Sequence, residues 1–173
     1  MSFIAGGGGR SNMKKLYIWI VFLLMIDLGT KWWAERSIPI GNGIKLSNQV
    51  SFVLVHNKGI SFGILSSHPY FALILQIVGV LSIAFFVTTF SSKYKVLQSV
   101  IKILILSGAI GNFLNRLVFG YVIDFISIKP YPFVFNIADI ELRLGLFLII
   151  CFIITRSVNN FKTGNNKIHT DYF

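Results

Sequence analysis

The sequence predicts an all-α membrane protein with four transmembrane helices and a small strand-bearing segment outside the bilayer. Three observations predict this class. Mean hydropathy is +0.73 and 13% of residues are charged, whereas soluble domains carry about 25%. Four apolar runs reach or approach the length of a bilayer crossing. A polar stretch between the first two runs alternates apolar and polar residues, which is typical of strands.

The first apolar run follows a Gly-rich start. Residues 1–12 are aperiodic, so we expect a flexible leader or tag ahead of a membrane domain at 13–160. The first predicted span is 16–33, which ends at the aromatic pair Trp32-Trp33, as helices do at a membrane interface. A cleaved signal peptide is the alternative, but no small-x-small site follows the run.

The segment Ile38 to Val55 is too polar to span a membrane. It contains the turn sequence Gly41-Asn42-Gly43, and the residues after the turn alternate in polarity. This pattern predicts a turn followed by short strands that lie on the membrane surface.

Three further spans complete the prediction. They are 70–90, 96–119 and 139–155, each largely apolar and about 26–36 Å long when helical, against a hydrocarbon core of about 30 Å. A mixed loop is expected over 120–139, and a polar, basic cytoplasmic tail over 161–173.

Charge sets the expected orientation. The chain has sixteen Lys and Arg but only six Asp and Glu, which gives it a net positive charge. Because the basic residues are dispersed beside apolar runs, we expect no nucleic-acid partner. Basic residues recur at the N-terminus, in the 91–95 loop and in the tail. These three segments share one side of a four-span protein, which the positive-inside rule makes cytoplasmic.

Polar residues gather near the outer ends of the predicted spans, where burying an ionisable group costs free energy. Pairs spaced four apart share a helix face. If these side chains converge, they bring together two carboxylates, one cation and several amides. This set of groups is typical of a paired-carboxylate hydrolase, in which one of the two carboxyls keeps its proton. The residues concerned are Asp27, Lys31, Asn112, Asn115, Arg116, Asp124, Asn136 and Asp139.

Each of these features also has a plainer interpretation. The Asp27–Lys31 pair would anchor a helix end at the interface, Asp124 would face water in a loop, and Arg116 would reach lipid headgroups. Asn136 and Asp139 would only begin a helix. Three other features are assigned structural roles: Ser107–Gly111 as close helix packing, Cys151 as an apolar packer, and Glu141 with Arg143 as a solvated pair. No group of residues has metal-ligand spacing.

Five sequence elements, taken in order over about residues 13–160, resemble the lipoprotein signal peptidase (signal peptidase II) family. The resemblance rests on their order as well as on their residues. The elements are Asp27-Leu-Gly-Thr-Lys31, Asn57-Lys-Gly59-Ile-Ser-Phe62-Gly63, Gly111-Asn112-Phe-Leu-Asn115-Arg116, Val122-Ile-Asp124-Phe125 and Phe135-Asn136-Ile-Ala138-Asp139, with Gly145 beyond.

The resemblance implies an aspartic endopeptidase of the bacterial inner membrane. It implies four transmembrane helices with a small extracytoplasmic β-rich cradle, both termini in the cytoplasm and an active site near the outer leaflet. The substrate would be a prolipoprotein whose Cys carries diacylglycerol, cut just before that Cys by a monomeric enzyme among membrane lipids, without metal or other cofactor.

The resemblance also assigns roles to residues. Asp124 and Asp139 match the catalytic dyad. A second group matches positions that orient the dyad or the substrate backbone: Asn57, Gly59, Asn112, Arg116 and Asn136. Asp27, Lys31 and Asn115 match structural supports.

Two departures from the family pattern leave alternatives open. Position 115 is Asn where the family has Asp, which removes a charge and an acceptor. Ile140 follows Asp139 where a small hydroxyl residue is usual. An inactive or specialised homologue that binds lipidated peptides is therefore one alternative. A small polytopic transporter component is another, although its polar residues would be expected throughout the depth of the membrane.

Overall fold

The computed structural model describes most of the chain. The described backbone comprises residues 7–40, 43–59 and 94–170, with scattered positions between 71 and 85. Two helices within these ranges are long and apolar enough to cross a membrane, Met13–Ser37 and Lys95–Phe119. The fold is mostly helical with one small antiparallel sheet.

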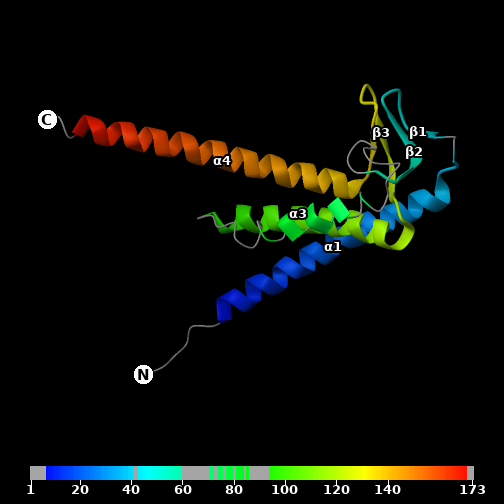
Figure 1. Ribbon diagram of the computed structural model, residues 1–173, viewed down its shortest axis with the longest axis horizontal. Coiled ribbons are helices and arrows are strands. Elements are labelled where there is room, and N and C mark those ends of the chain that lie inside the picture. The colour runs from blue at the N-terminus through cyan, green and yellow to red at the C-terminus, as the bar shows by residue number, and fades with distance from the viewer. Residues whose placement is uncertain are drawn as a thin grey trace.

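Within the described ranges 7–40 and 94–170 there are three long helices (Figure 1). They are α1 (Gly7–Ser37), α3 (Lys95–Phe119) and α4 (Ile137–Thr170). The spans predicted at 16–33, 96–119 and 139–155 each fall within one of them. α1 begins inside the segment expected to be a leader, and α4 continues through most of the expected tail.

The predicted second span, 70–90, lies largely outside the described residues. The positions that are described there are helical, from Phe71 to Phe85 with gaps. The remainder of the Asn57–Gly63 motif after Gly59 also lies outside the described residues, as do residues 91–93 and the terminal residues 1–6 and 171–173.

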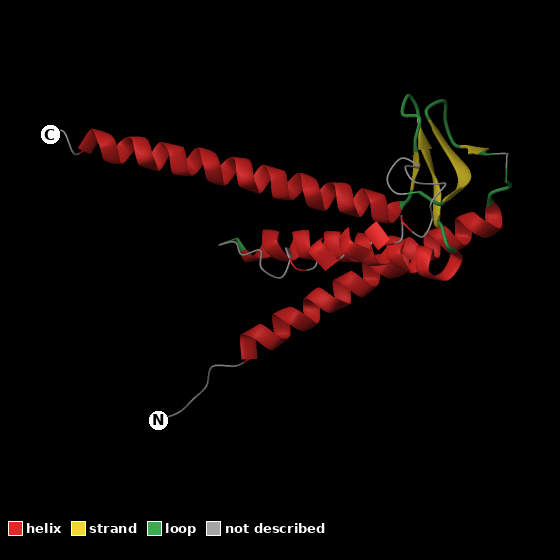
Figure 2. Cartoon of the chain, in the orientation of Figure 1, coloured by secondary structure: helices red, strands yellow, loops and turns green. Residues whose placement is uncertain are grey.

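A four-stranded sheet stands at one end of the helices, well separated from the chain termini (Figure 2). Its spatial order follows the chain, and every neighbouring pair is antiparallel. The strands are β1 (Ile44–Lys45), β2 (Val50–Asn57), β3 (Val122–Ile128) and β4 (Val134–Phe135). The strands predicted within 38–55 are thereby confirmed.

The mixed loop expected between 120 and 139 is wrong in part, because it contains β3 and β4. Val122, Ile123, Asp124 and Phe125 are all buried, so β3 is covered on both faces and lacks the polar alternation that marks a surface strand. Gly120 ends α3 with a positive φ of 78°, a left-handed conformation that favours glycine, and turns the chain into β3.

The sheet packs on the last turns of α1. Ala34, Ile38, Leu54, Ile123 and Phe125 form a buried cluster. Around it, the ring of Trp33 meets the rings of Phe52 and Phe125 edge to face, with centroids 5.3 and 6.2 Å apart. These contacts fix the sheet directly against the end of the helix that carries Asp27 and Lys31.

Glycines bring the three helices close together. A Cβ placed on Gly108 would lie 2.5 Å from the carbonyl oxygen of Ala138 in α4, and one on Gly111 would overlap the carboxylate of Asp27 in α1. The close packing predicted for Ser107–Gly111 is confirmed. Because α3 contacts both α1 and α4, side chains from all three helices meet at this level.

Candidate active site

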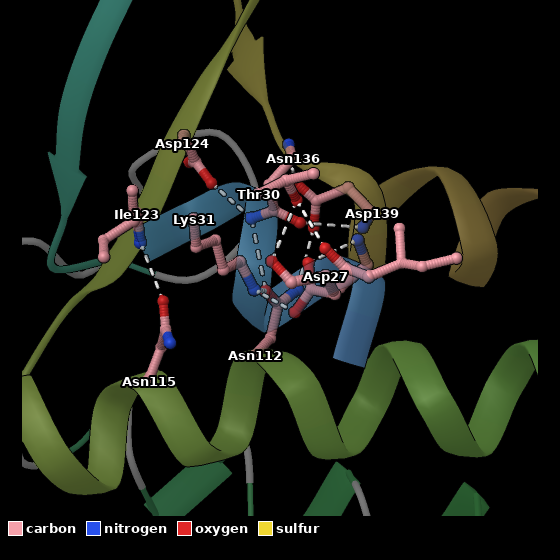
Figure 3. A network of polar contacts seen from close by, with 11 residues as sticks. Asp27, Thr30, Lys31, Asn112, Asn115, Ile123, Asp124, Asn136 and Asp139 are labelled. Carbon is pink, nitrogen blue, oxygen red and sulfur yellow. Dashed lines mark hydrogen bonds and ion pairs between the residues drawn. The ribbon is translucent and has the colours of Figure 1, made fainter. Parts of the chain in front are cut away.

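The polar residues singled out in the sequence do converge. They meet where the C-terminal halves of α1 and α3, the start of α4 and the strands β2 and β3 come together (Figure 3). The network is built of charge-bearing and amide side chains from five segments that are distant in sequence.

Asp27 and Lys31 form the ion pair that their spacing predicted. Lys31 Nζ lies 2.7 Å from Asp27 Oδ2, and both side chains are at most 1% exposed. The other Asp27 oxygen accepts the backbone N–H of Ala138 at 3.0 Å, which satisfies a free donor at the start of α4. The pair is therefore a buried junction of α1 and α4, and its interpretation as an interfacial anchor is wrong.

Asn112 carries the network from this ion pair to Asp139. Its amide oxygen accepts from Lys31 Nζ at 2.9 Å, and its amide nitrogen donates to Asp139 Oδ1 at 2.9 Å. Because the lysine fixes which end of the amide accepts, the amide N–H must point at the Asp139 carboxyl. One face of α3 thus joins α1 to the first turn of α4.

Asn136 and Asp139 begin α4 with reciprocal hydrogen bonds. The Asp139 N–H donates to Asn136 Oδ1 at 3.0 Å, and the Asn136 N–H donates to Asp139 Oδ2 at 3.4 Å. This is the geometry of a capping box. The helix-start interpretation is confirmed, and the cap also fixes the direction in which the Asp139 carboxyl points.

The same Asn136 side chain reaches the second carboxylate. Its Nδ2 donates to Asp124 Oδ1 at 2.6 Å and to Asn112 Oδ1 at 3.2 Å. Asn136 is completely buried. One residue therefore contacts both carboxylates, and Figure 3 shows it between Asp124 on β3 and Asp139 on α4.

Asp124 is buried on β3 and accepts two amide donors. Besides Asn136, the Asn57 Nδ2 donates to its Oδ2 at 2.9 Å from the end of β2. Burial, with a smaller contribution from the charge of Asp139, raises the pKa of Asp124 to about 6, although the two amides oppose the shift. The interpretation of Asp124 as a water-facing loop residue is wrong, since its side chain is 2% exposed.

Arg116 points inward from α3. Its Nη2 donates to the carbonyl oxygen of Gly59, and its guanidinium lies within electrostatic range of Asp124 and Asp139. Gly59 is in turn held by its own N–H, which donates to Asn57 Oδ1 at 3.0 Å. Arg116 thus ties the Asn57–Gly59 turn to the carboxylates, and its interpretation as a headgroup anchor is wrong.

Asn115 is buried but belongs to a different contact. Its Oδ1 accepts the backbone N–H of Ile123 at 3.2 Å, one residue before Asp124. The acceptor expected to be lost with the change from Asp to Asn is therefore present. A carboxylate oxygen would accept the same N–H.

One group near the site was not found from the sequence, and a second was assigned the wrong surroundings. His56 Nε2 lies 2.9 Å from a Glu35 oxygen, and the imidazole stacks on Tyr121. Glu141 is 4% exposed and packs against α3, while Arg143 lies over the ring of Phe135, so their assignment as a solvated pair is wrong. A surface His–Glu pair 21 residues apart leaves no periodic signal. Glu141 could have been suspected because it lies two residues after Asp139 at the start of an apolar run.

The arrangement fits acid–base chemistry by two carboxyls held in different surroundings. Asp124 is buried, whereas Asp139 is partly exposed. Among the described residues, no group of three or more His, Cys, Asp or Glu is placed to hold a metal ion.

Comparison with known proteins gives consistent matches. The model of the signal peptidase (SPase) II family, Peptidase_A8, matches residues 19–155. A lipoprotein signal peptidase of Clostridium tetani (strain Massachusetts / E88) is 37% identical over 140 residues, which cover 78% of this chain and 89% of that protein.

Solved structures agree with the sequence matches. Two structures of a bacterial membrane enzyme, determined by the in meso method, are each 29% identical to this chain. For the first, the TM-score is 0.75, and the match covers 84% of this chain and 91% of the chain in the solved structure. For the second, the TM-score is 0.70, and the match covers 81% of this chain and 92% of the chain in the solved structure.

Proposed function

Because the chain belongs to the signal peptidase II family of membrane-bound peptidases, we propose that it removes signal peptides from prolipoproteins with Asp124 and Asp139 as its catalytic dyad. The observation that carries the dyad assignment is the double contact of Asn136. This one buried side chain donates to Asp124 and receives the N–H of Asp139, so the two carboxyls are held in one rigid unit.

The surroundings of the two carboxyls support different roles. Asp124 is buried and has a raised pKa, which favours its protonated form. Asp139 is partly exposed and accepts N–H donors from Asn112 and Asn136, so it is the carboxyl of the two that water can reach. We assign Asp139 as the base that takes a proton from the attacking water and later passes it to the leaving amine. Asp124 is the acid that protonates the scissile carbonyl oxygen and recovers a proton from the resulting gem-diol as the C–N bond breaks.

The remaining polar residues support this pair. Asn57 and Arg116 connect Asp124 to the Gly59 turn, whose backbone is a candidate contact for an extended substrate peptide. Lys31 and Asn112 hold the Asp139 side. Asp27 supports Lys31 from α1, and Asn115 supports the β3 backbone at Ile123.

We further propose the finer features that the family implies. The chain crosses the bacterial inner membrane four times with both termini in the cytoplasm, and it acts as a monomer. The site then lies near the outer leaflet, because the sheet stands at the end of α1 opposite the basic N-terminus. The substrate Cys carries diacylglycerol, and the cut falls just before it.

Asn115 bears on the alternative of an inactive homologue. The residue contacts the β3 backbone at Ile123, and the described contacts of its side chain do not include either carboxyl. Its change from the family's Asp therefore leaves the dyad and its amide donors in place, and the active enzyme is the better supported function.

A cleavage assay with matched precursors tests the proposal. The purified protein in detergent receives one prolipoprotein in two forms, with and without diacylglycerol on the Cys, and mass spectrometry identifies the products. We expect cleavage of the modified form alone, just before the lipidated Cys, and none by Asp124→Asn. Equal cleavage of both forms would refute the substrate assignment, and cleavage by Asp124→Asn would refute the dyad.

A further inference from the structure

Glu35, His56 and Tyr121 form a cluster at the outer end of α1 that the proposed reaction does not use. His56 Nε2 lies 3.1 Å from Glu35 Oε1 and 2.9 Å from Oε2. The imidazole also stacks on the ring of Tyr121, with centroids 4.1 Å apart and planes 21° from parallel. We call these three residues the His56 clasp. The clasp joins α1, β2 and the turn before β3.

The clasp lies one residue from the site. In the β2–β3 pairing, His56 is opposite Ile123 and the next residue, Asn57, is opposite Val122. Asn57 is the residue whose amide donates to Asp124 Oδ2. Any movement of the strand at His56 is therefore transmitted directly to an amide that contacts a proposed catalytic carboxyl.

The clasp lies on the part of β2 that follows an interruption of the strand register. The pairing with β3 shifts between Phe52 and Val55, as at a β-bulge. A bulge bends a strand and disrupts its ladder locally. After the bulge, Val55, His56 and Asn57 pair with β3 again. The clasp holds this last part of the strand from outside the ladder, through Glu35 on α1 and Tyr121 before β3.

The clasp itself contributes little to overall stability. His56 and Glu35 are 32% and 35% exposed, and ion pairs with this exposure are worth about 0–1 kcal/mol. Its geometry is nevertheless specific, with two oxygens on one ring nitrogen and a stacked ring beneath. A weak but well-oriented contact beside a reacting group is suited to positioning.

We propose that His56 is a positioning residue: held by Glu35 and Tyr121, it fixes the end of β2 so that Asn57 remains on Asp124. This inference rests on the proposed function of Asp124, and it assigns a role to residues outside the dyad and its direct contacts.

The position of Asn57 affects the proton affinity of Asp124. The hydrogen bond from Asn57 lowers the pKa of Asp124, against the larger effects of burial and of Asp139 on α4. The other charged groups that act on Asp124 are Lys31 on α1, which is bonded to Asp27 and Asn112, and Arg116 on α3, which is bonded to Gly59. Loosening the clasp should therefore weaken the hydrogen bond from Asn57, which stabilises the ionised carboxylate. The pKa of Asp124 should then rise above about 6.

The test is the pH profile of kcat/KM for cleavage of the lipidated precursor. We compare the parent with His56→Ala, Glu35→Ala and the double variant, and with His56→Gln, which keeps a donor for Glu35. Glu35→Ala retains the imidazole but removes its partner, so it opens the His56–Glu35 contact from the α1 side. Val55→Ala is the matched control, because it truncates the neighbouring, exposed side chain of the same strand.

We expect both single alanine variants to move the alkaline limb upward by roughly 0.5–1 pH unit, the size of one weakened hydrogen bond. The double variant should move it no further, because either change opens the same clasp. His56→Gln should restore most of the parent profile, and Val55→Ala should leave it unchanged. A general loss of folded protein would lower the whole profile without moving its limb.

The proposal is overturned if Asn57→Ala moves the limb while His56→Ala and Glu35→Ala do not, or if Val55→Ala moves it as much. A second measurement does not depend on turnover. The infrared band of the protonated Asp124 carboxyl, identified by difference against Asp124→Asn, is titrated in the parent and in His56→Ala. A higher midpoint in His56→Ala supports the clasp even if the substrate assignment fails, and coincident midpoints refute it.

Discussion

At the scale of single residues, the proposed chemistry depends on how Asp124 is held. A carboxyl that is 2% exposed, with a pKa of about 6 against an ordinary 3.8, is costly to ionise in the folded protein. Folding therefore favours the protonated form of Asp124. Two consequences follow, one for stability and one for catalysis.

The stability of the folded protein should fall as pH rises through the interval between these two pKa values. Below about 4 the carboxyl is neutral in both states. Between about 4 and 6 it ionises first in the unfolded chain, and above about 6 the penalty is constant at about 3 kcal/mol. Asp124→Asn lacks this titration, so its Tm relative to the parent should rise from pH 4 to 6 and then level. A Tm difference that is independent of pH would contradict the assignment.

The catalytic acid, Asp124, should lose its proton over the same pH interval, and activity should fall with it. If Asp124 donates the proton, kcat/KM falls as pH rises through an apparent pKa of about 6, because the free enzyme's essential acid sets the alkaline limb. A pH series of initial rates at low substrate concentration measures the limb. A profile that is flat from pH 5 to 8 would exclude Asp124 as the acid.

Asn115→Asp should be tolerated. Either side chain offers an oxygen to the Ile123 N–H, and a charge-assisted hydrogen bond there would offset part of the desolvation of the new carboxylate. We expect folded protein with activity within about tenfold of the parent, equivalent to less than about 1.4 kcal/mol. Asn115→Leu, which removes the acceptor and leaves the N–H unsatisfied, is the matched comparison and should lose more. Equal losses would show that the acceptor is unimportant.

The sequence predicted most members of the site but not how they connect. The spacings of Asp27 with Lys31 and of Asn112 with Arg116 place those side chains on shared helix faces, which is local information. The contact of Asn136 with Asp124 depends on how α4 meets β3, and the contact of His56 with Glu35 depends on how β2 meets α1. Such tertiary contacts have no sequence period.

At the scale of elements, the glycines of α3 determine how closely the helices approach. A side chain at Gly111 would overlap the carboxylate of Asp27, whereas one at Gly29 in α1 would have nothing within 4 Å. The two positions are therefore a matched pair of helix glycines with opposite surroundings.

Gly111→Ala should destabilise the protein and Gly29→Ala should not. The first forces the Asp27–Lys31 pair or the α1–α3 contact to shift, which typically costs about 1–3 kcal/mol. The second removes only glycine's entropic disadvantage in a helix, about 0.5–1 kcal/mol. Thermal unfolding in detergent measures both. A Tm for Gly111→Ala at or above that of Gly29→Ala would show that the packing at Gly111 is not tight.

Helices were easier to predict from the sequence than strands. α1 and α3 follow long apolar runs, and β1 and β2 follow a turn with alternating residues. β3 was expected to be loop because its first four residues are all buried, so it shows no alternation, and the acid among them suggested contact with water. The partner that buries it, the end of α1, is about 90 residues away in the sequence, for example from Ala34 to Ile123.

At the scale of the whole molecule, the sheet and the polar network occupy one end of the helices, and the basic termini extend from the other (Figure 1). If the protein crosses the membrane as proposed, Lys129 at the end of β3 faces outward and Lys95 at the start of α3 faces the cytoplasm.

Cysteine labelling tests this orientation. In a Cys151→Ser background, we expect Lys129→Cys to react with a membrane-impermeant thiol reagent in intact cells. Lys95→Cys should react only after the membrane is permeabilised. Labelling of Lys95→Cys in intact cells, with Lys129→Cys protected, would reverse the proposed topology and place the site on the cytoplasmic side.

The most direct test of the central claim, that Asp124 and Asp139 act as one dyad, is single-turnover cleavage of the lipidated precursor by Asp124→Asn and Asp139→Asn beside the parent. Precursor binding is measured in the same samples. Loss of either carboxyl removes the shared proton chemistry, so we expect both variants to bind the precursor and to cleave it at least about 10²–10⁴-fold more slowly. A variant that binds the precursor and cleaves it at close to the parent rate would contradict the dyad.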